Sequence, residues 1–114
     1  MATDYIQMTV DVSKQTAVLR KDITETMSGF SAMAGAACKA NALDAKTKEY
    51  IALGMAVALR CEPCIAFHAK ALVKLGVTRA EYEEVLGVAV YMGGGPSLMY
   101  SAHAMEAFDQ FSAK

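Results

Sequence analysis

The sequence predicts an all-α fold. Apolar residues recur at helical spacing along most of the chain, whereas no segment alternates polar and apolar residues as a half-buried strand does. Turn-forming residues at 41–44 and 93–96 separate the helical stretches. With 114 residues, 54% of them hydrophobic, the chain can form one core, so we expect a single compact multi-helix domain over residues 1–114.

The first predicted helix is long and begins near Lys14. Residues 1–12 have no clear period, and we treat them as a leader that could pack on a neighbouring subunit; the core then spans residues 14–112. The apolar positions of this helix are Leu19, Ile23, Met27, Phe30, Ala34 and Ala37. We expect a break near Gly29. Cys38 lies among small residues, and a buried role as a small hydrophobe is the better interpretation than a third redox partner.

A second helix is predicted over residues 45–59, with Asp44 as its N-cap. One apolar face would contain Ile51, Met55, Ala58 and Leu59. Glu49 lies on another line of this helix and, judged by residue type alone, would be a solvated surface carboxylate. However, a chain reversal near Arg60 would place Glu49 opposite residues 68–72 of the next helix.

The next helix begins with a cysteine pair. Cys61 and Cys64 are three residues apart and His68 follows four residues later, so all three lie along one helical stripe. The first turn of a helix stabilises a thiolate, which is the reactive form of cysteine, and Arg60 adds positive charge nearby. His68 could take the proton of a thiol, and the second thiol could form a disulfide with the oxidised first one. We therefore predict a relay from Glu49 through His68 to Cys64, directly or through a water.

Two further helices complete the chain. Gly76 ends the cysteine helix, and Thr78 with Glu81 forms a capping box for the next one. The buried face of that helix would contain Tyr82, Val85, Leu86, Ala89 and Val90. Glycines 93–95 end it, because a phosphate-binding loop would follow a strand. The last helix starts at residue 96 or 97 and would bury Leu98, Ala102, Met105, Phe108 and Phe111. His103 lies beside that line, as a polar edge residue or a subunit contact.

Composition excludes several classes of partner. The net charge is −1, from 11 basic and 12 acidic residues, and no basic block indicates a nucleic-acid or membrane partner. No signal peptide is apparent and no apolar run approaches ~18 residues, so we expect a cytoplasmic protein. In that reducing compartment a close cysteine pair is typical of a catalytic or metal-binding site. The excess of apolar residues indicates burial between subunits of a homo-oligomer.

These motifs together resemble the alkylhydroperoxidase D-like family within the carboxymuconolactone decarboxylase superfamily. A glutamate stands twelve positions before a Cys-x-x-Cys motif, and a histidine follows four residues after the second cysteine. A Leu-Gly turn, an acidic helix and a Gly-Gly-Gly-Pro segment come next. The likeness covers roughly residues 43–108. Family members often have a histidine between the two cysteines, where this chain has Pro63. Proline suits the first turn of a helix, but it cannot relay protons.

The resemblance implies an all-helical subunit that assembles as a homotrimer or homohexamer and acts as a peroxidase and disulfide reductase. By the same likeness Cys64 would attack the peroxide, Cys61 would be the resolving cysteine, and His68 and Glu49 would form the proton relay. A thiol or a lipoyl-bearing protein would supply the electrons, and no cofactor is expected. Superfamily decarboxylases generally lack the cysteine pair, so that activity is disfavoured.

We therefore predict a thiol-dependent peroxidase that reduces organic hydroperoxides in a site lined by Ile65, Phe67 and methionines. A disulfide oxidoreductase or redox sensor acting on a protein partner would use the same thiols. A zinc-binding module formed by Cys61, Cys64 and His68 is a weaker alternative, because its fourth ligand would have to be Cys38, His103 or a group from another subunit.

Overall fold

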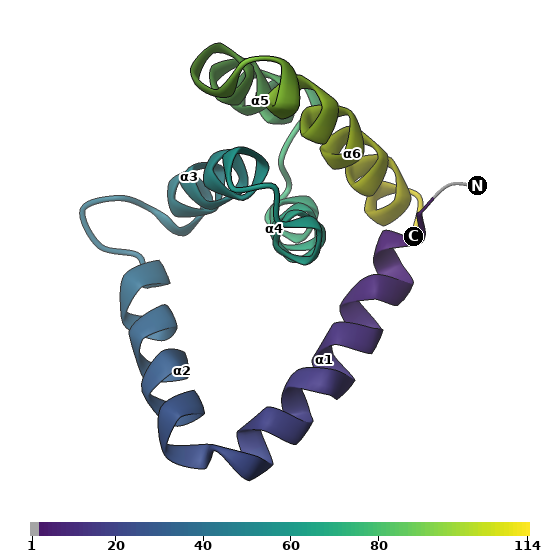
Figure 1. The fold of residues 1–114 in the computed structure, drawn as a ribbon. Coiled ribbons are helices and arrows are strands. Elements are labelled where there is room, and N and C mark those ends of the chain that lie inside the picture. Colours follow the sequence, from purple (N-terminus) through teal and green to yellow (C-terminus); the bar gives the residue numbers. More distant parts are fainter. Residues whose placement is uncertain (1–2) are drawn as a thin grey trace.

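The computed structural model describes residues 3–114, which form six α-helices and no strand (Figure 1). The helices are α1 (Tyr5–Asp22), α2 (Thr24–Cys38), α3 (Ala45–Ala58), α4 (Glu62–Lys74), α5 (Arg79–Gly93) and α6 (Gly95–Ser112). The prediction of an all-α domain is confirmed. None of these helices is both long and apolar enough to cross a bilayer.

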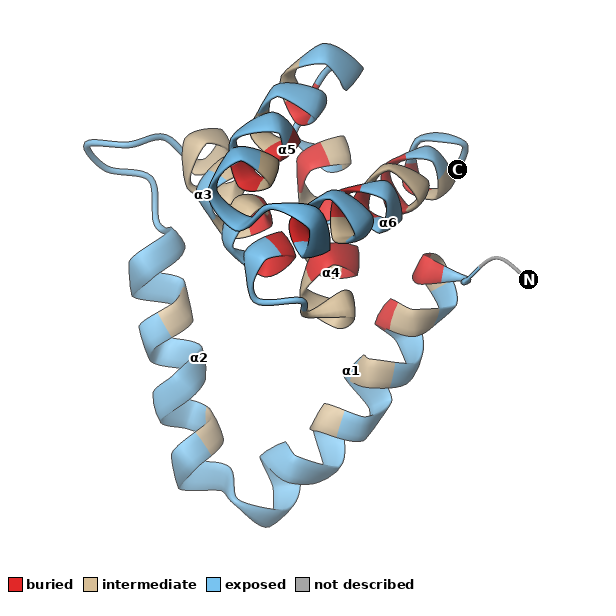
Figure 2. Cartoon of the chain, turned by 45° about the horizontal axis from the view of Figure 1, so that its top comes forward, coloured by how far each residue is buried: buried red, intermediate tan, exposed pale blue. Residues whose placement is uncertain are grey.

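The core lies between α3, α4, α5 and α6, with α4 at its centre (Figure 2). Ile65, Ala66, Ala69 and Leu72 of α4 are all fully buried. Burying a side chain such as Ile65 or Leu72 contributes about 1.5–3 kcal/mol. Because α4 packs against both α3 and α6, its N-terminus is held between these two helices.

The first two helices extend away from this core as a V (Figures 1 and 2). Helix α1 packs on α4 and α6 and buries Tyr5 and Thr9, whereas α2 has no buried residue at all. The prediction of a leader over residues 1–12 is therefore wrong for residues 5–12, which belong to α1; residues 1 and 2 lie outside the described part. Tyr5 is buried because two other helices cover it.

The predicted break near Gly29 is also wrong, because the chain leaves helical geometry at Ile23, with φ −124° and ψ 58°. A helix tolerates one internal glycine at a cost of about 1 kcal/mol. Ile23 and Thr24 are both β-branched, and such residues lower helix propensity at the point where the break occurs.

The other predicted helix ends are confirmed. The Asp44 side chain accepts the Thr47 N–H at 2.7 Å, and Thr78 and Glu81 form the expected capping box. Gly76 and Gly94 have φ values of 80° and 69°, a conformation that favours glycine at the end of a helix. These local signals place the ends of α3, α4 and α5 correctly.

One predicted apolar face, that of α3, points away from the core of this chain, and another, that of α6, does so in part. Ile51 and Leu59 of α3 are 49% and 73% exposed, whereas Leu53 and Val57 are fully buried. Met55 and Ala58 are exposed as well. In α6 Leu98 and Ala102 are exposed, whereas Phe108 and Phe111 are buried as predicted and Met105 packs against the core. Two faces of α3 have helical periodicity, and packing against α4 and α5 selects the one that contains Leu53 and Val57. Large apolar side chains therefore remain on the outer surface of this chain.

Candidate active site

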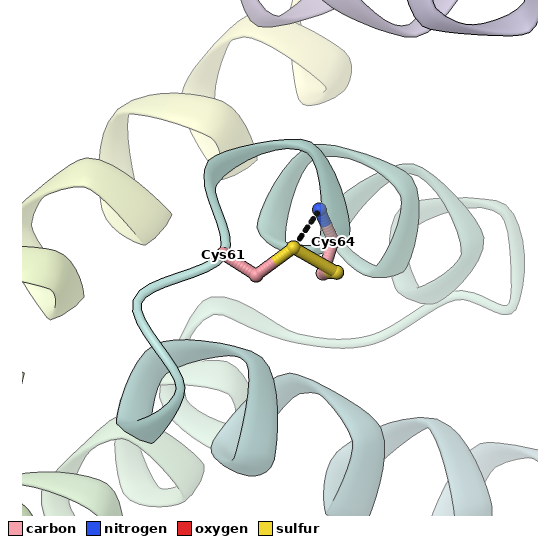
Figure 3. Close-up of a disulfide and its surroundings, with 2 residues drawn as sticks. All are labelled: Cys61 and Cys64. Carbon is pink, nitrogen blue, oxygen red and sulfur yellow. Dashed lines mark hydrogen bonds between the residues drawn. A yellow bond between two sulfur atoms is a disulfide. The ribbon is translucent and has the colours of Figure 1, made fainter.

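The two cysteines lie at the N-terminus of α4 and are joined in a disulfide, with a Cα–Cα distance of 5.2 Å (Figure 3). Cys61 is the N-cap, and its Sγ accepts the N–H of Cys64 at 3.3 Å. Arg60 has a positive φ of 57°, which turns the chain from α3 into this cap. Pro63 fits the first turn because its missing N–H is not needed there. The helix N–H therefore reaches the sulfur of Cys61.

His68 and Glu49 come from different helices and are in contact. The Nδ1 atom of His68 lies 2.7 Å from Glu49 Oε2, and their side chains are 30% and 18% exposed. A carboxylate only accepts hydrogen bonds, so Nδ1 carries the proton and Nε2 is left as an acceptor. The structure thus brings together the two residues that the sequence paired.

The remaining link of the predicted relay runs from His68 to Cys64. His68 follows Cys64 by one helical turn, but within residues 3–114 no hydrogen bond joins the His68 ring to either sulfur. A relay through this pair would need a bridging water or a movement of the side chains. Cys64 is half-buried and packs on the core. Ile65 is fully buried, so the prediction that it lines an accessible site is wrong.

A second carboxylate–histidine pair lies beside the cysteines, and the sequence did not reveal it. Glu62, between the two cysteines, accepts the Tyr5 phenol at 3.0 Å with Oε2 and pairs with His103 Nδ1 through Oε1. Burial raises the pKa of Tyr5, and the Glu62 carboxylate adds to the rise. Glu62 was recognisable only as part of the motif, because Tyr5 and His103 lie 57 and 41 residues away from it in sequence.

Cys38 differs from its expected position, and the disfavoured zinc alternative gains no support. Cys38 is the last residue of α2 and is exposed, so its predicted burial is wrong. The cause is that α2 packs against little of its own chain. In the part of the chain that the structure describes, no three His, Cys, Asp or Glu side chains converge to hold a metal ion. The proposed zinc ligands therefore do not form a set.

Comparison with known proteins places this geometry in a family. The model of the Carboxymuconolactone decarboxylase family matches residues 24–107, which include both cysteines and both carboxylate–histidine pairs. The chain belongs to this family. Its six-helix architecture agrees with the alkylhydroperoxidase D-like resemblance found in the sequence.

Solved structures of family members have the same fold. A carboxymuconolactone decarboxylase family protein from Legionella pneumophila superposes with a TM-score of 0.92 at 56% identity, covering 95% of this chain and 96% of that one. A Thermotoga maritima family member, for which a role in antioxidative response has been suggested, has a TM-score of 0.73 at 24% identity, covering 87% and 91%. At 24% identity, the likeness to the Thermotoga maritima protein shows a shared fold and nothing more.

Sequence relatives span nearly the whole chain. An uncharacterised protein of Cupriavidus necator is 34% identical over 113 residues, which is 99% of this chain and 100% of its own length. Another, from Haemophilus influenzae, is 40% identical over 108 residues, covering 95% and 96%. Neither name states an activity. The geometry of the site is therefore the main guide to the chemistry of this carboxymuconolactone decarboxylase family member.

Proposed function

We propose that the protein is a thiol-dependent peroxidase that reduces organic hydroperoxides with Cys64 and Cys61. The observation that carries this proposal is the pair of bridgeable sulfurs at the start of α4, followed one turn later by a histidine that a carboxylate of α3 holds at 2.7 Å. An imidazole in that state can accept a thiol proton, and an activated thiolate is the nucleophile that peroxides require.

In the proposed reaction His68 accepts the proton of the Cys64 thiol, and the thiolate attacks the terminal oxygen of the hydroperoxide. The O–O bond breaks, Cys64 becomes a sulfenic acid, and the alkoxide leaves as an alcohol with the proton from His68. The Cys61 thiol then attacks the sulfenic sulfur, which releases water and forms the disulfide. Glu49 keeps the imidazole oriented through both steps.

A thiol reductant must return the disulfide to two thiols. We propose a small thiol or a lipoyl-type protein in this role, because a dithiol can reduce both sulfurs in two successive exchanges. A reducing compartment such as the cytoplasm would supply it. No nucleic acid, membrane or cofactor takes part in the proposed cycle.

Assembly of the subunits as a homotrimer or homohexamer belongs to the same proposal. Helix α2 has no buried residue, although Phe30 and Met33 are large and apolar and are 57% and 62% exposed. An amphipathic helix gains most of its stability from packing an apolar face. Contact with another subunit would provide that packing.

The first experiment counts thiols. The reduced protein contains three cysteines, and addition of cumene hydroperoxide should remove the thiols of Cys61 and Cys64 while that of Cys38 persists. In the Cys61→Ser variant a dimedone probe should label sulfenic acid at Cys64, and Cys38→Ser should react like the wild type. If peroxide leaves all three thiols intact, the peroxidase proposal is wrong.

A disulfide oxidoreductase or redox sensor is the second candidate, because the same bridgeable pair suits exchange with a protein partner. Steady-state turnover separates the two. A peroxidase consumes reductant in proportion to added hydroperoxide, whereas an oxidoreductase consumes it in proportion to an added protein disulfide. A decarboxylase would consume no thiol.

A further inference from the structure

Glu62 is bound on both of its carboxylate oxygens, by one residue from each end of the chain. We propose that His103, oriented by Glu62, is a general base for the thiol reductant that attacks Cys61, so that the attack on the peroxide and the attack on the disulfide are assisted by different histidines. This inference takes one step from the proposed function, namely that the reductant attacks Cys61.

The position of Glu62 is strongly constrained. It is the first residue of α4, directly after Cys61, and the Tyr5 phenol donates to its Oε2 at 3.0 Å. Tyr5 is 1% exposed, and its backbone N–H donates to Gln110 of α6 at 2.7 Å. Because the phenol cannot turn toward solvent, it holds the carboxylate in place and leaves Oε1 for His103.

His103 is set up as a base that faces the outside. Its Nδ1 pairs with Glu62 Oε1, so Nδ1 carries the proton and Nε2 is left to accept one. Its side chain is 46% exposed, against 30% for His68. The ring also packs edge-on against Tyr100, with centroids 5.2 Å apart, which limits its rotation. A reductant arriving from solvent can therefore reach His103 more readily than His68.

The two pairs divide the proton transfers of disulfide reduction. His103 removes the proton of the incoming thiol, whose sulfur attacks Cys61; the Cys61–Cys64 bond breaks and Cys64 leaves as a thiolate. A second thiol then attacks the reductant sulfur of the mixed disulfide, and its proton passes through His68 to the Cys64 thiolate. The oxidised reductant leaves, and the Cys61 thiolate receives the proton held by His103. Two thiols of the reductant become one disulfide, and the protein disulfide becomes two thiols.

The test compares two reductants that differ in their need for a base. The protein is oxidised with diamide, which forms the disulfide without peroxide, and then mixed with dithiothreitol or with a water-soluble phosphine. Alkylation after acid quench and mass measurement give the rate of disulfide loss. A thiol must lose a proton to attack, whereas a phosphine has none to lose. The variants are His103→Asn and Glu62→Gln, with Asp109→Asn as the control that breaks another exposed ion pair of α6.

We expect His103→Asn to slow reduction by dithiothreitol roughly a hundredfold, the lower end of general-base effects, and to leave reduction by the phosphine unchanged. Glu62→Gln should slow the same reaction, and Asp109→Asn should slow neither. The inference is overturned if His103→Asn leaves the dithiothreitol rate at the wild-type value, or if it slows both reductants equally. Failure of wild-type protein to react with cumene hydroperoxide would refute the peroxidase proposal and leave this result standing.

Discussion

His68 and Glu49 are 19 residues apart in sequence, yet their side chains meet at 2.7 Å because α3 and α4 pack side by side. The contact fixes which ring nitrogen carries the proton before any substrate arrives. A base oriented in advance needs no reorganisation during the reaction. The following predictions test this pair and the features around it.

Replacing the carboxylate should impair the oxidative step. In Glu49→Gln the amide can no longer hold a protonated imidazole as a carboxylate does, so we expect the rate at which cumene hydroperoxide oxidises Cys64 to fall roughly ten- to hundredfold. Stopped-flow mixing with quenched thiol counting measures this rate. Glu84→Gln removes an exposed carboxylate of α5 and should react at the wild-type rate. Equal rates in the two variants would show that Glu49 has no part in the reaction.

The apolar face of α2 should matter for assembly. A double substitution, Phe30→Glu with Met33→Glu, places charges where contact with another subunit would bury them, at a cost of several kcal/mol. We expect sedimentation velocity to show smaller species than the wild type forms. Ser28→Glu adds a charge on the opposite side of the same helix and should preserve the oligomer. A wild-type protein that sediments as a monomer would refute the assembly proposal.

Tyr5 should stabilise the domain through its phenol as well as its ring. Tyr5→Phe keeps the buried ring but removes the hydrogen bond to the Glu62 carboxylate, so we expect the free energy of unfolding to fall by about 1–2 kcal/mol. Urea denaturation monitored by circular dichroism measures the change. Tyr91 is 84% exposed, and Tyr91→Phe should leave stability unchanged. A similar loss in both variants would contradict the predicted role of the Tyr5 phenol.

Stability should also fall in acid through the capping box of α5. The backbone N–H of Thr78 and the ammonium of Lys46 lower the pKa of Glu81 from 4.5 to about 2. Because the pKa is lower in the folded state, the unfolded state binds more protons, and the contribution of Glu81 is present above pH 4.5 and lost as pH falls toward 2. The difference in urea midpoint between wild type and Glu81→Gln should therefore shrink across this range. If the difference in urea midpoint between the two proteins stays constant from pH 6 to pH 2, the predicted contribution of Glu81 is wrong.

Most helix ends that were predicted from neighbouring residues are confirmed, the break near Gly29 excepted, whereas several predictions of burial, which depend on distant partners, are wrong. Asp44 and Thr78 cap helices through groups three residues away, so their roles could be read locally. Cys38 was expected to be buried because its neighbours are small, yet it is exposed, and no residue of α2 is buried within this chain. Glu49 was an exception: a single antiparallel reversal sufficed to bring it near His68.

The spacing of Cys61, Cys64 and His68 was enough to predict that the three residues lie on one side of a helix, since 3.6 residues per turn places them there whatever surrounds the helix. The periodicity of apolar residues was likewise enough to predict an all-α chain. Which apolar face turns inward depended on packing, because α3 carries two candidate faces and α4 covers only one of them. The contacts of Glu62 with Tyr5 and His103 arise in the same way, since the packing of α1 and α6 on α4 brings together residues that are far apart in the chain.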